Sequence, residues 1–487
     1  MRPDLKAILS HSAVYSVAEA INKAAAILLV PLYTRVFPQA EYGVLELTRA
    51  TVALLASVST LAVASAFQRY YSEAHSDPAL MREGFRHAVS VAIVGTSSIG
   101  ALVFLFSAPL AGLTLGDESK WRLMQLVTGV VFLEGLATLS MMAARMERQP
   151  VRYAVTSLVR FLVGTSAIVY LVLVRGLGIE AVLIGQMLGA AVAVAILGLR
   201  YGWLLPLSLA PVKRLLRFSV PLLPAGIAFL LMMLADRFML RWLTSVEEVA
   251  VYGIAVKFGL VVAVGMVRPF RAAAGPVLYA RHKEVNAPLF AAHITTYIWV
   301  GAIGISLVLT AFASEAVAII APPSYATAAL IAPTLMVAQA MLGLRDMMSY
   351  GLAIREKTWV VSVLAVAGLM VNVVLNYVFI RIWGALGAGM ATLVASVVTV
   401  LLLGVVGRRW YPLPIEWGRL SLSGAVFAVV GVGLYLAGGG GLAWIIKPLL
   451  VISVPFWLWL VGFYKPAEID ALRNLPRNIS QRVRTIW

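Results

Sequence analysis

The sequence has 487 residues, of which 61% are hydrophobic and only 13% are charged, whereas soluble domains are roughly half apolar and a quarter charged. This balance excludes an ordinary soluble protein, and the absence of cysteine excludes disulfides, thiol nucleophiles and cysteine-ligated metal sites. A formal net charge of +17 would favour a nucleic-acid partner for a soluble protein, but membrane proteins gather basic residues in cytoplasmic loops. No nucleic-acid partner is therefore expected.

Apolar blocks of about twenty residues recur along the chain, and this is the length that crosses a bilayer core of about 30 Å. The first block lacks the cleavage pattern of a signal peptide, so we expect it to be retained. Polar breaks separate about fourteen predicted transmembrane helices, and the sequence thus predicts an all-α integral membrane protein. These helices cover residues 12–34, 42–65, 86–109, 121–142, 153–174, 180–199, 217–240, 250–267, 288–312, 325–344, 358–380, 385–407, 419–437 and 443–463.

The distribution of basic residues predicts the orientation of these helices. With the N-terminus inside, 27 of the 39 Lys and Arg residues fall in segments predicted to be cytoplasmic and 6 in segments predicted to be outside. The remaining 6 lie within the predicted helices. This asymmetry follows the positive-inside rule, so both termini are predicted to be cytoplasmic.

The first six predicted helices resemble the next six. Four matched segments recur in order at an offset of 206 to 210 residues: Ile8–Ser12 with Leu215–Ser219, Glu41–Val44 with Val251–Ile254, Arg145–Arg148 with Ile354–Lys357, and Arg175–Gly178 with Arg381–Gly384. Six helices per repeat give both halves the same orientation, as in transporters that hold substrate between two lobes and rock to alternate access.

We therefore predict two six-helix lobes around a central cavity, followed by two extra C-terminal helices. The predicted N-terminal lobe covers residues 1–204 and the predicted C-terminal lobe residues 205–410. Residues 411–464 are predicted to hold the two extra transmembrane helices, and residues 465–487 a basic cytoplasmic tail.

Four short stretches carry a family resemblance. They are Pro31–Arg35 followed by Glu41–Gly43, Pro221–Pro224, Asp236–Arg237 followed by Tyr252–Gly253, and Gly384–Ala388. Together with the helix layout, they make the chain similar to the Wzx-type O-antigen and exopolysaccharide flippases of the multidrug/oligosaccharidyl-lipid/polysaccharide exporter superfamily.

The resemblance implies a two-lobed, V-shaped fold in the bacterial inner membrane. It also implies a cargo of undecaprenyl-pyrophosphate-linked oligosaccharide, moved from the cytoplasmic to the periplasmic leaflet during polysaccharide and lipopolysaccharide biosynthesis. The expected partners are this lipid-linked oligosaccharide and membrane lipids, with a polysaccharide polymerase and chain-length proteins as further candidates.

Four basic residues lie inside helices that the resemblance places around the cavity, namely Lys23, Arg49, Arg237 and Lys257. Intramembrane cations are costly unless they face a wet cavity or a partner, and a pyrophosphate crossing a membrane needs fixed cations. We therefore predict that these residues bind the pyrophosphate, with Arg49 and Lys257 approaching from opposite lobes. The alternative is local neutralisation by an acid within four residues, which each of the four except Lys257 has.

Four intramembrane acids, Glu19, Glu46, Glu134 and Asp236, are candidates for coupling transport to protons or sodium ions. Glu134 is the leading candidate because it has no oppositely charged neighbour in sequence, and an ion pair with another helix is the equal alternative. Arg160 is interpreted as a snorkelling or packing residue. Beyond a coupling ion, the sequence predicts no cofactor, no metal site and no catalytic residue.

The leading prediction is an ion-coupled flippase that works by alternating access and is not an enzyme. One alternative is a multidrug or cation antiporter of the same superfamily, which would favour acidic rather than basic cavity linings. A membrane-embedded glycan polymerase or ligase ranks lower, because the predicted outer loops are short and hold no carboxylate cluster.

Overall fold

The computed structural model describes residues 27–60, 63–71, 77–198, 209–220, 223–438, 441–466 and 468. Across these residues the chain forms helices and no strand, as the sequence predicts. Ten of the described helices are long and apolar enough to cross a membrane, or up to eleven with one bent pair counted as a single span. The chain is therefore a multi-pass membrane protein.

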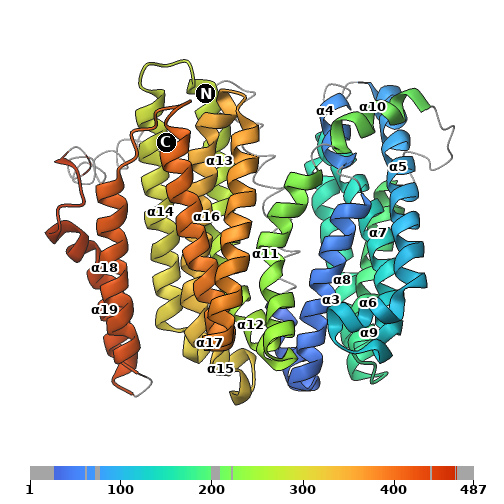
Figure 1. Ribbon diagram of the computed structural model, residues 1–487, viewed down its shortest axis with the longest axis horizontal. Coiled ribbons are helices and arrows are strands. Elements are labelled where there is room, and N and C mark those ends of the chain that lie inside the picture. Colours follow the sequence, from blue (N-terminus) through green and yellow to red (C-terminus); the bar gives the residue numbers. More distant parts are fainter. Residues whose placement is uncertain are drawn as a thin grey trace, which may run out of the picture.

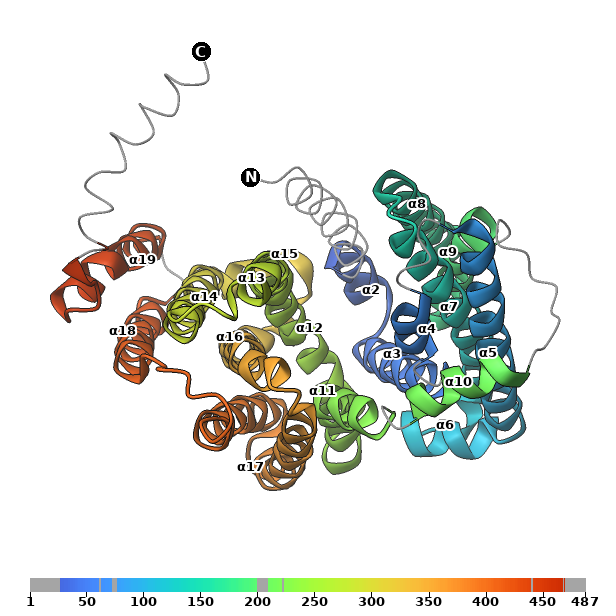
Figure 2. The same ribbon diagram turned by 90° about the horizontal axis from the view of Figure 1, so that it is seen from above.

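Two helix bundles stand side by side (Figures 1 and 2). We call the first the N lobe; it comprises α2 (Val30–Val36), α3 (Gln39–Ser59), α4 (Val63–Tyr71), α5 (Pro78–Leu105), α6 (Ser107–Leu115), α7 (Trp121–Met146), α8 (Pro150–Leu173) and α9 (Ile179–Ala193). The second, the C lobe, comprises α11 (Leu223–Leu243), α12 (Val246–Val262), α13 (Arg268–Arg281), α14 (Ala287–Ala311), α15 (Ala313–Ile320), α16 (Ala328–Ile354) and α17 (Thr358–Gly407). Between them in the chain, α10 (Leu209–Ser219) packs against α4 and α5.

Local sequence signals set several helix ends. The Asp77 carboxylate caps α5 by accepting from the backbone N–H groups of Ala79 and Leu80. Gly116 ends α6 in the left-handed conformation, with φ of 80°, which glycine adopts without strain. Ser245 begins α12, where its hydroxyl accepts from the N–H of Glu248.

The 50-residue helix α17 is two antiparallel helices joined at Gly384. The Asn372 amide lies 3.5 Å from the Thr392 hydroxyl, although a straight helix would separate residues twenty apart by about 30 Å. Gly384 has φ of 56° and ψ of −133°, a conformation essentially restricted to glycine. The Glu248 carboxylate stabilises the reversal by accepting from the N–H of Ala385 at 2.7 Å. The two halves lie where helices were predicted at 358–380 and 385–407.

The count of ten or eleven spans differs from the predicted fourteen for identifiable reasons. The reversal inside α17 hides one crossing, and α3 and α4, which cover the predicted 42–65 helix, are bent by 47°. Helix α11, of 21 residues, lies where the 217–240 helix was predicted but is not among the ten. Most of the predicted 12–34 helix lies outside the described residues. Fourteen therefore remains a prediction.

The lobes are joined at one end of the molecule, which we call the α15 end; α4 and α10 lie at the opposite, α10 end (Figure 1). At the α15 end, the Thr34 hydroxyl donates to the carbonyl of Ile320 at 2.7 Å, and the Trp242 indole donates to the carbonyl of Leu113 at 3.0 Å. Tyr42 and Tyr325 pack edge to face across the same junction. In the predicted orientation, this is the periplasmic end.

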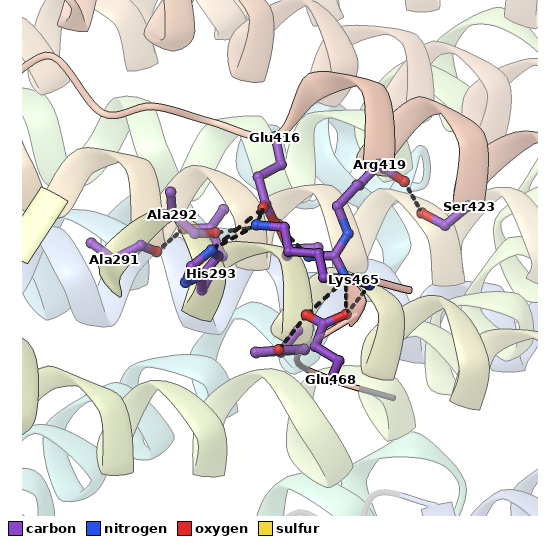
Figure 3. Close-up of polar contacts among 11 residues, drawn as sticks. Ala291, Ala292, His293, Glu416, Arg419, Ser423, Lys465 and Glu468 are labelled. Carbon is purple, nitrogen blue, oxygen red and sulfur yellow. Dashed lines mark hydrogen bonds and ion pairs between the residues drawn. The ribbon is translucent and has the colours of Figure 1, made fainter. Parts of the chain in front are cut away.

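Helices α18 (Trp417–Leu436) and α19 (Ala443–Leu460) pack on α14 at the outer side of the C lobe (Figure 2). A charged cluster holds this pair near the α10 end (Figure 3). Arg419 donates to Glu416 at 3.0 Å and to Glu468 at 2.8 Å, and Lys465 also pairs with Glu416. The Thr296 hydroxyl of α14 donates to Glu416 at 2.7 Å, so the cluster ties the C-terminal pair to the C lobe.

The cluster changes the titration of its two carboxylates. Burial raises the pKa of Glu416, but hydrogen bonds from Lys465 and Thr296 and the charge of Arg419 outweigh burial and hold it below its usual value. Burial also raises the pKa of Glu468. Hydrogen bonds from Tyr297, Lys465 and Arg419 outweigh this effect, so the pKa of Glu468 is lowered as well. At the other end, the buried Lys447 of α19 pairs with Glu315 of α15 at 2.5 Å.

Candidate functional site

A charged network centred on Glu46 connects the lobes within the predicted membrane region. The ammonium of Lys257 on α12 donates to Oε1 of Glu46 on α3 at 2.9 Å. Arg49, one turn further along α3, donates to the same oxygen at 3.2 Å, and Arg237 of α11 lies 4.0 Å from Oε2. We call these four residues the Glu46 network.

Two Tyr-Gly pairs allow α3 and α12 to approach closely enough for this contact. A Cβ on Gly43 would lie 2.0 Å from the carbonyl oxygen of Val246, and a Cβ on Gly253 would lie 2.7 Å from Cγ of Glu46. Neither distance leaves room for a side chain, so glycine is required at both positions. Glu46 consequently lies against Gly253, one helical turn from Lys257.

Three residues of the network are buried, the side chain of Arg49 is 21% exposed, and the network carries excess positive charge. Glu46 is 2% exposed, Arg237 8% and Lys257 9%, while the guanidinium of Arg49 lies 5.0 Å from the ring centroid of Tyr33. Three cations around one carboxylate leave a net charge of +2. In a low-dielectric region this excess favours a multiply charged anion.

The structure brings together four of the predicted site residues, Glu46, Arg49, Arg237 and Lys257. One of them, Lys257, has an acidic partner that the sequence did not indicate. Lys257 was distinguished by the absence of an acid near it in sequence, yet it pairs with Glu46, 211 residues away. The predicted local pair of Glu46 and Arg49 is present. Glu19 and Lys23 lie outside the described residues.

Asp236 occupies a separate polar site inside the C lobe. One carboxylate oxygen accepts from Asn376 at 2.8 Å, and the other accepts from the hydroxyls of Tyr252 at 2.6 Å and Thr392 at 2.8 Å. Asn376 also donates to Oδ1 of Asn372 at 3.0 Å. Asp236 is 2% exposed, and its hydrogen-bond partners among the described residues are neutral, so dipoles rather than a salt bridge satisfy its carboxylate oxygens.

Sequence reasoning missed the partners of Asp236. Asn372 and Asn376 are spaced by one turn within a long apolar stretch, and that pair of amides was an available signal. Thr392 offered none, because threonine hydroxyls in transmembrane helices normally bond to their own backbone. Tyr252 was noted only as part of the repeat and of the family resemblance, and neither indicates a bond to Asp236.

Glu134 has a partner on another helix. Nη2 of Arg160 on α8 donates to both oxygens of Glu134, at 2.5 and 2.7 Å, near the middle of α7. Of the two alternatives left open for Glu134, the structure therefore contains the ion pair. Arg160 was interpreted as a snorkelling or packing residue; its guanidinium does not snorkel but bonds Glu134 on the neighbouring helix and lines a cavity, which leaves the packing alternative.

This cavity, of about 610 Å³, lies within the N lobe among α2, α3, α7, α8 and α9. Its lining includes Glu134 and Arg160 as well as Arg49 and Lys257, so it extends between the ion pair and the Glu46 network. Close packing of α8 on α9 shapes it, since a Cβ on Gly189 would lie 3.0 Å from the carbonyl oxygen of Arg160. Its volume is within the roughly 300–1,000 Å³ typical of small-molecule sites.

Comparisons with known proteins agree on the class of protein. A family described as polysaccharide biosynthesis protein matches residues 8–282, more than half of the chain. No curated protein matches. The solved structure of the lipid II flippase MurJ in an inward closed conformation superposes with a TM-score of 0.71 at 13% identity, covering 92% of this chain and all of that one.

Multidrug transporters share the fold less closely. The inward-facing conformation of a MATE family transporter of the MOP superfamily gives a TM-score of 0.57 at 15% identity, covering 82% of this chain and 93% of that one. A point mutant of the MATE transporter VcmN of Vibrio cholerae gives 0.59 at 13% identity, covering 83% and 96%. At these identities the structural likenesses show the fold alone.

Proposed function

The chain belongs to the polysaccharide biosynthesis protein family, and from that premise we propose that it is a flippase for undecaprenyl-pyrophosphate-linked oligosaccharide. It would carry this cargo from the cytoplasmic to the periplasmic leaflet of the bacterial inner membrane by alternating access, with both termini cytoplasmic. The observation that supports this most strongly is the Glu46 network, whose three cations converge from two lobes on one carboxylate.

The network has the chemistry of a pyrophosphate site. A pyrophosphate between lipid and sugar has an ionised oxygen on each phosphoryl group, which matches the net charge of +2. Guanidinium groups bind phosphoryl oxygens in bidentate fashion and the Lys257 ammonium adds a point charge. Burial makes these interactions stronger than they would be in water.

Glu46 acts in this proposal as a resident counterion that the cargo displaces. Because Glu46 is on the N lobe while Arg237 and Lys257 are on the C lobe, its ion pairs also hold the α15 end together. A pyrophosphate that takes over these cations removes that tie between the lobes. Cargo binding therefore favours separation of the lobes at the predicted periplasmic end, which is the step that alternating access requires.

Asp236 is the residue we propose for ion coupling, in preference to Glu134. Its carboxylate is surrounded by oxygen-bearing groups of Tyr252, Thr392 and Asn376, and Oδ1 of Asn376 has no hydrogen-bond partner among the described residues. Hard cations such as sodium prefer such oxygen donors, and a proton on the carboxylate is the alternative cargo. Asp236→Asn should abolish the dependence of transport on the coupling ion, and a sodium or pH gradient imposed on proteoliposomes identifies which ion it is.

The flippase proposal is tested by glycan export in a flippase-null strain, with protein levels in the membrane measured for each variant. Arg49→Ala and Lys257→Ala should each severely reduce export, since each removes charge-assisted hydrogen bonds to the cargo. Lys257→Arg should retain much of the activity because it keeps the charge, whereas Arg49→Lys should lose more because the guanidinium fork is lost. The matched control is Lys447→Ala, which removes a buried intramembrane lysine outside the network.

Normal export by both Arg49→Ala and Lys257→Ala would contradict the anion site. The multidrug antiporter alternative makes the opposite prediction, because a cationic drug would be repelled by the network. Efflux of a cationic drug by the wild-type protein, with no restoration of glycan export in the flippase-null strain, would favour that alternative.

A further inference from the structure

The N-lobe cavity presents polar groups that neither the anion site nor the coupling site uses. Ser57, Thr138, Thr165 and Gln186 line it, and their side chains have no hydrogen-bond partner among the described residues. Many helical hydroxyls in this chain instead bond to their own backbone, as Thr60 does to the carbonyl of Ala56 at 2.9 Å. Hydrogen-bonding capacity is thus left free along this cavity.

The Glu134–Arg160 pair adds charged groups that can form further hydrogen bonds. Both bonds to Glu134 come from Nη2 of Arg160, so Nε and Nη1 have no partner among the described residues. The two side chains are 23% and 26% exposed, within helices predicted to cross the membrane. Each carboxylate oxygen can accept further hydrogen bonds, so the pair offers both donors and acceptors to a ligand.

These groups have the chemistry that recognises a sugar ring. Adjacent sugar hydroxyls donate to a carboxylate and accept from a guanidinium, and an amide such as Gln186 does both. The cavity is also lined by the Phe161 ring, which suits the apolar face of a sugar. A lipid chain would leave the side chains of Ser57, Thr138, Thr165 and Gln186 without hydrogen-bond partners, which is costly.

We propose that this cavity is a subsite for one uncharged sugar ring of the cargo, held by Glu134, Arg160 and Gln186, and distinct from the pyrophosphate site at Glu46. The inference rests on the proposed flippase function and adds to it a place where the glycan is read. Its volume of about 610 Å³ lies within the range of small-molecule sites and leaves room for a hydrated sugar ring. The subsite makes the protein selective for the sugar, while the network makes it selective for the anion.

The test measures binding of purified full-length protein to undecaprenyl pyrophosphate and to the same lipid carrying one glucose, galactose or N-acetylglucosamine. Wild-type protein should bind at least one sugar-bearing lipid about tenfold more tightly than the bare lipid, the effect of one well-made hydrogen bond. In Glu134→Gln/Arg160→Gln that preference should fall to within about twofold, with affinity for the bare lipid unchanged. Glu315→Gln/Lys447→Gln, an intramembrane ion pair outside the cavity, should keep the preference.

Substitutions at uncharged residues of the cavity provide the same test if the Glu134→Gln/Arg160→Gln variant fails to fold. Thr165→Val and Gln186→Leu should each reduce the sugar preference and leave binding of the bare lipid intact. The sugar subsite is refuted if no sugar improves binding to wild type, or if the cavity variants weaken both lipids equally. Bare-lipid binding that survives Lys257→Ala would instead refute the anion site, and wild-type protein that binds neither lipid would overturn both.

Discussion

Replacing Lys257 with methionine tests whether the Glu46 network holds the lobes together. Methionine keeps the length of the side chain but removes the ammonium that donates to Glu46 at 2.9 Å. Arg237, at 4.0 Å, is then the remaining cation of the C lobe near that carboxylate in the described residues. We expect the α15 end to separate more often in this variant.

The magnitude follows from the geometry of the contact. A hydrogen bond between charged groups contributes about 1.5–3 kcal/mol when one partner is removed. Lys257 also repels Arg49 and Arg237, which converge on the same carboxylate, so the lower value of about 1.5 kcal/mol applies. This corresponds to about a tenfold shift of the equilibrium towards the separated state.

The absence of cysteine makes the measurement direct, because introduced cysteines are the only reactive thiols. Gln39 and Glu247 lie on opposite lobes at the α15 end, where the Gln39 amide reaches the Glu247 carbonyl at 3.4 Å. In Gln39→Cys/Glu247→Cys, cross-linking by a short reagent should be slower with Lys257→Met than without it. Lys447→Met is the control, and equal cross-linking in all three proteins would refute the role of the network in closing the lobes.

Three further predictions concern the fold. Gly384→Ala should lower stability by about 1–3 kcal/mol, because its backbone conformation strains any side chain, and a lower unfolding temperature in detergent is the measurement. Glu416 and Glu468 have pKa values below the usual 4.5, so their contribution to stability is complete above that pH and is lost as the pH falls through their lowered pKa values. Amide protection factors in the first turn of α18, which correct for the pH dependence of intrinsic exchange, should then fall, and unchanged protection in acid that protonates both carboxylates would contradict this. Reporter fusions after residues 117 and 283 should indicate outside and inside respectively, and the reverse would refute the predicted orientation.

The sequence was sufficient for the features that depend on local composition. Apolar block length predicts membrane helices because the bilayer sets that length. The repeated Tyr-Gly pairs indicated the internal repeat, and the structure adds that their glycines allow the close approach of α3 and α12. The charged residues of the Glu46 network could be identified individually, since ionisable groups are rare in such helices. Their convergence on the Glu46 carboxylate could not be predicted, because it depends on how the two lobes pack against each other.

Contacts between helices explain where the structure alters these interpretations. Arg160 was interpreted as a snorkelling or packing residue, and its bond to Glu134 on the neighbouring helix excludes snorkelling. Glu134 was ranked above Asp236 for coupling because it lacked a charged neighbour in sequence. The reverse ranking follows from the structure, in which Glu134 has a cation and Asp236 has only neutral partners among the described residues.

An anion carrier in a membrane must remain stable when it is empty, and three converging cations without a counterion would be strongly destabilising. Glu46 solves this problem by neutralising part of the charge, and it leaves enough excess to attract a pyrophosphate. Glu46 is on the N lobe, and Arg237 and Lys257 are on the C lobe. The ion pairs that neutralise these charges are therefore also contacts that hold the lobes together. In the proposed mechanism, the cargo supplies the anion that lets the lobes separate without leaving the cations unpaired. Recognition of the lipid carrier would thereby be coupled to the conformational change, whichever sugar the N-lobe cavity accepts.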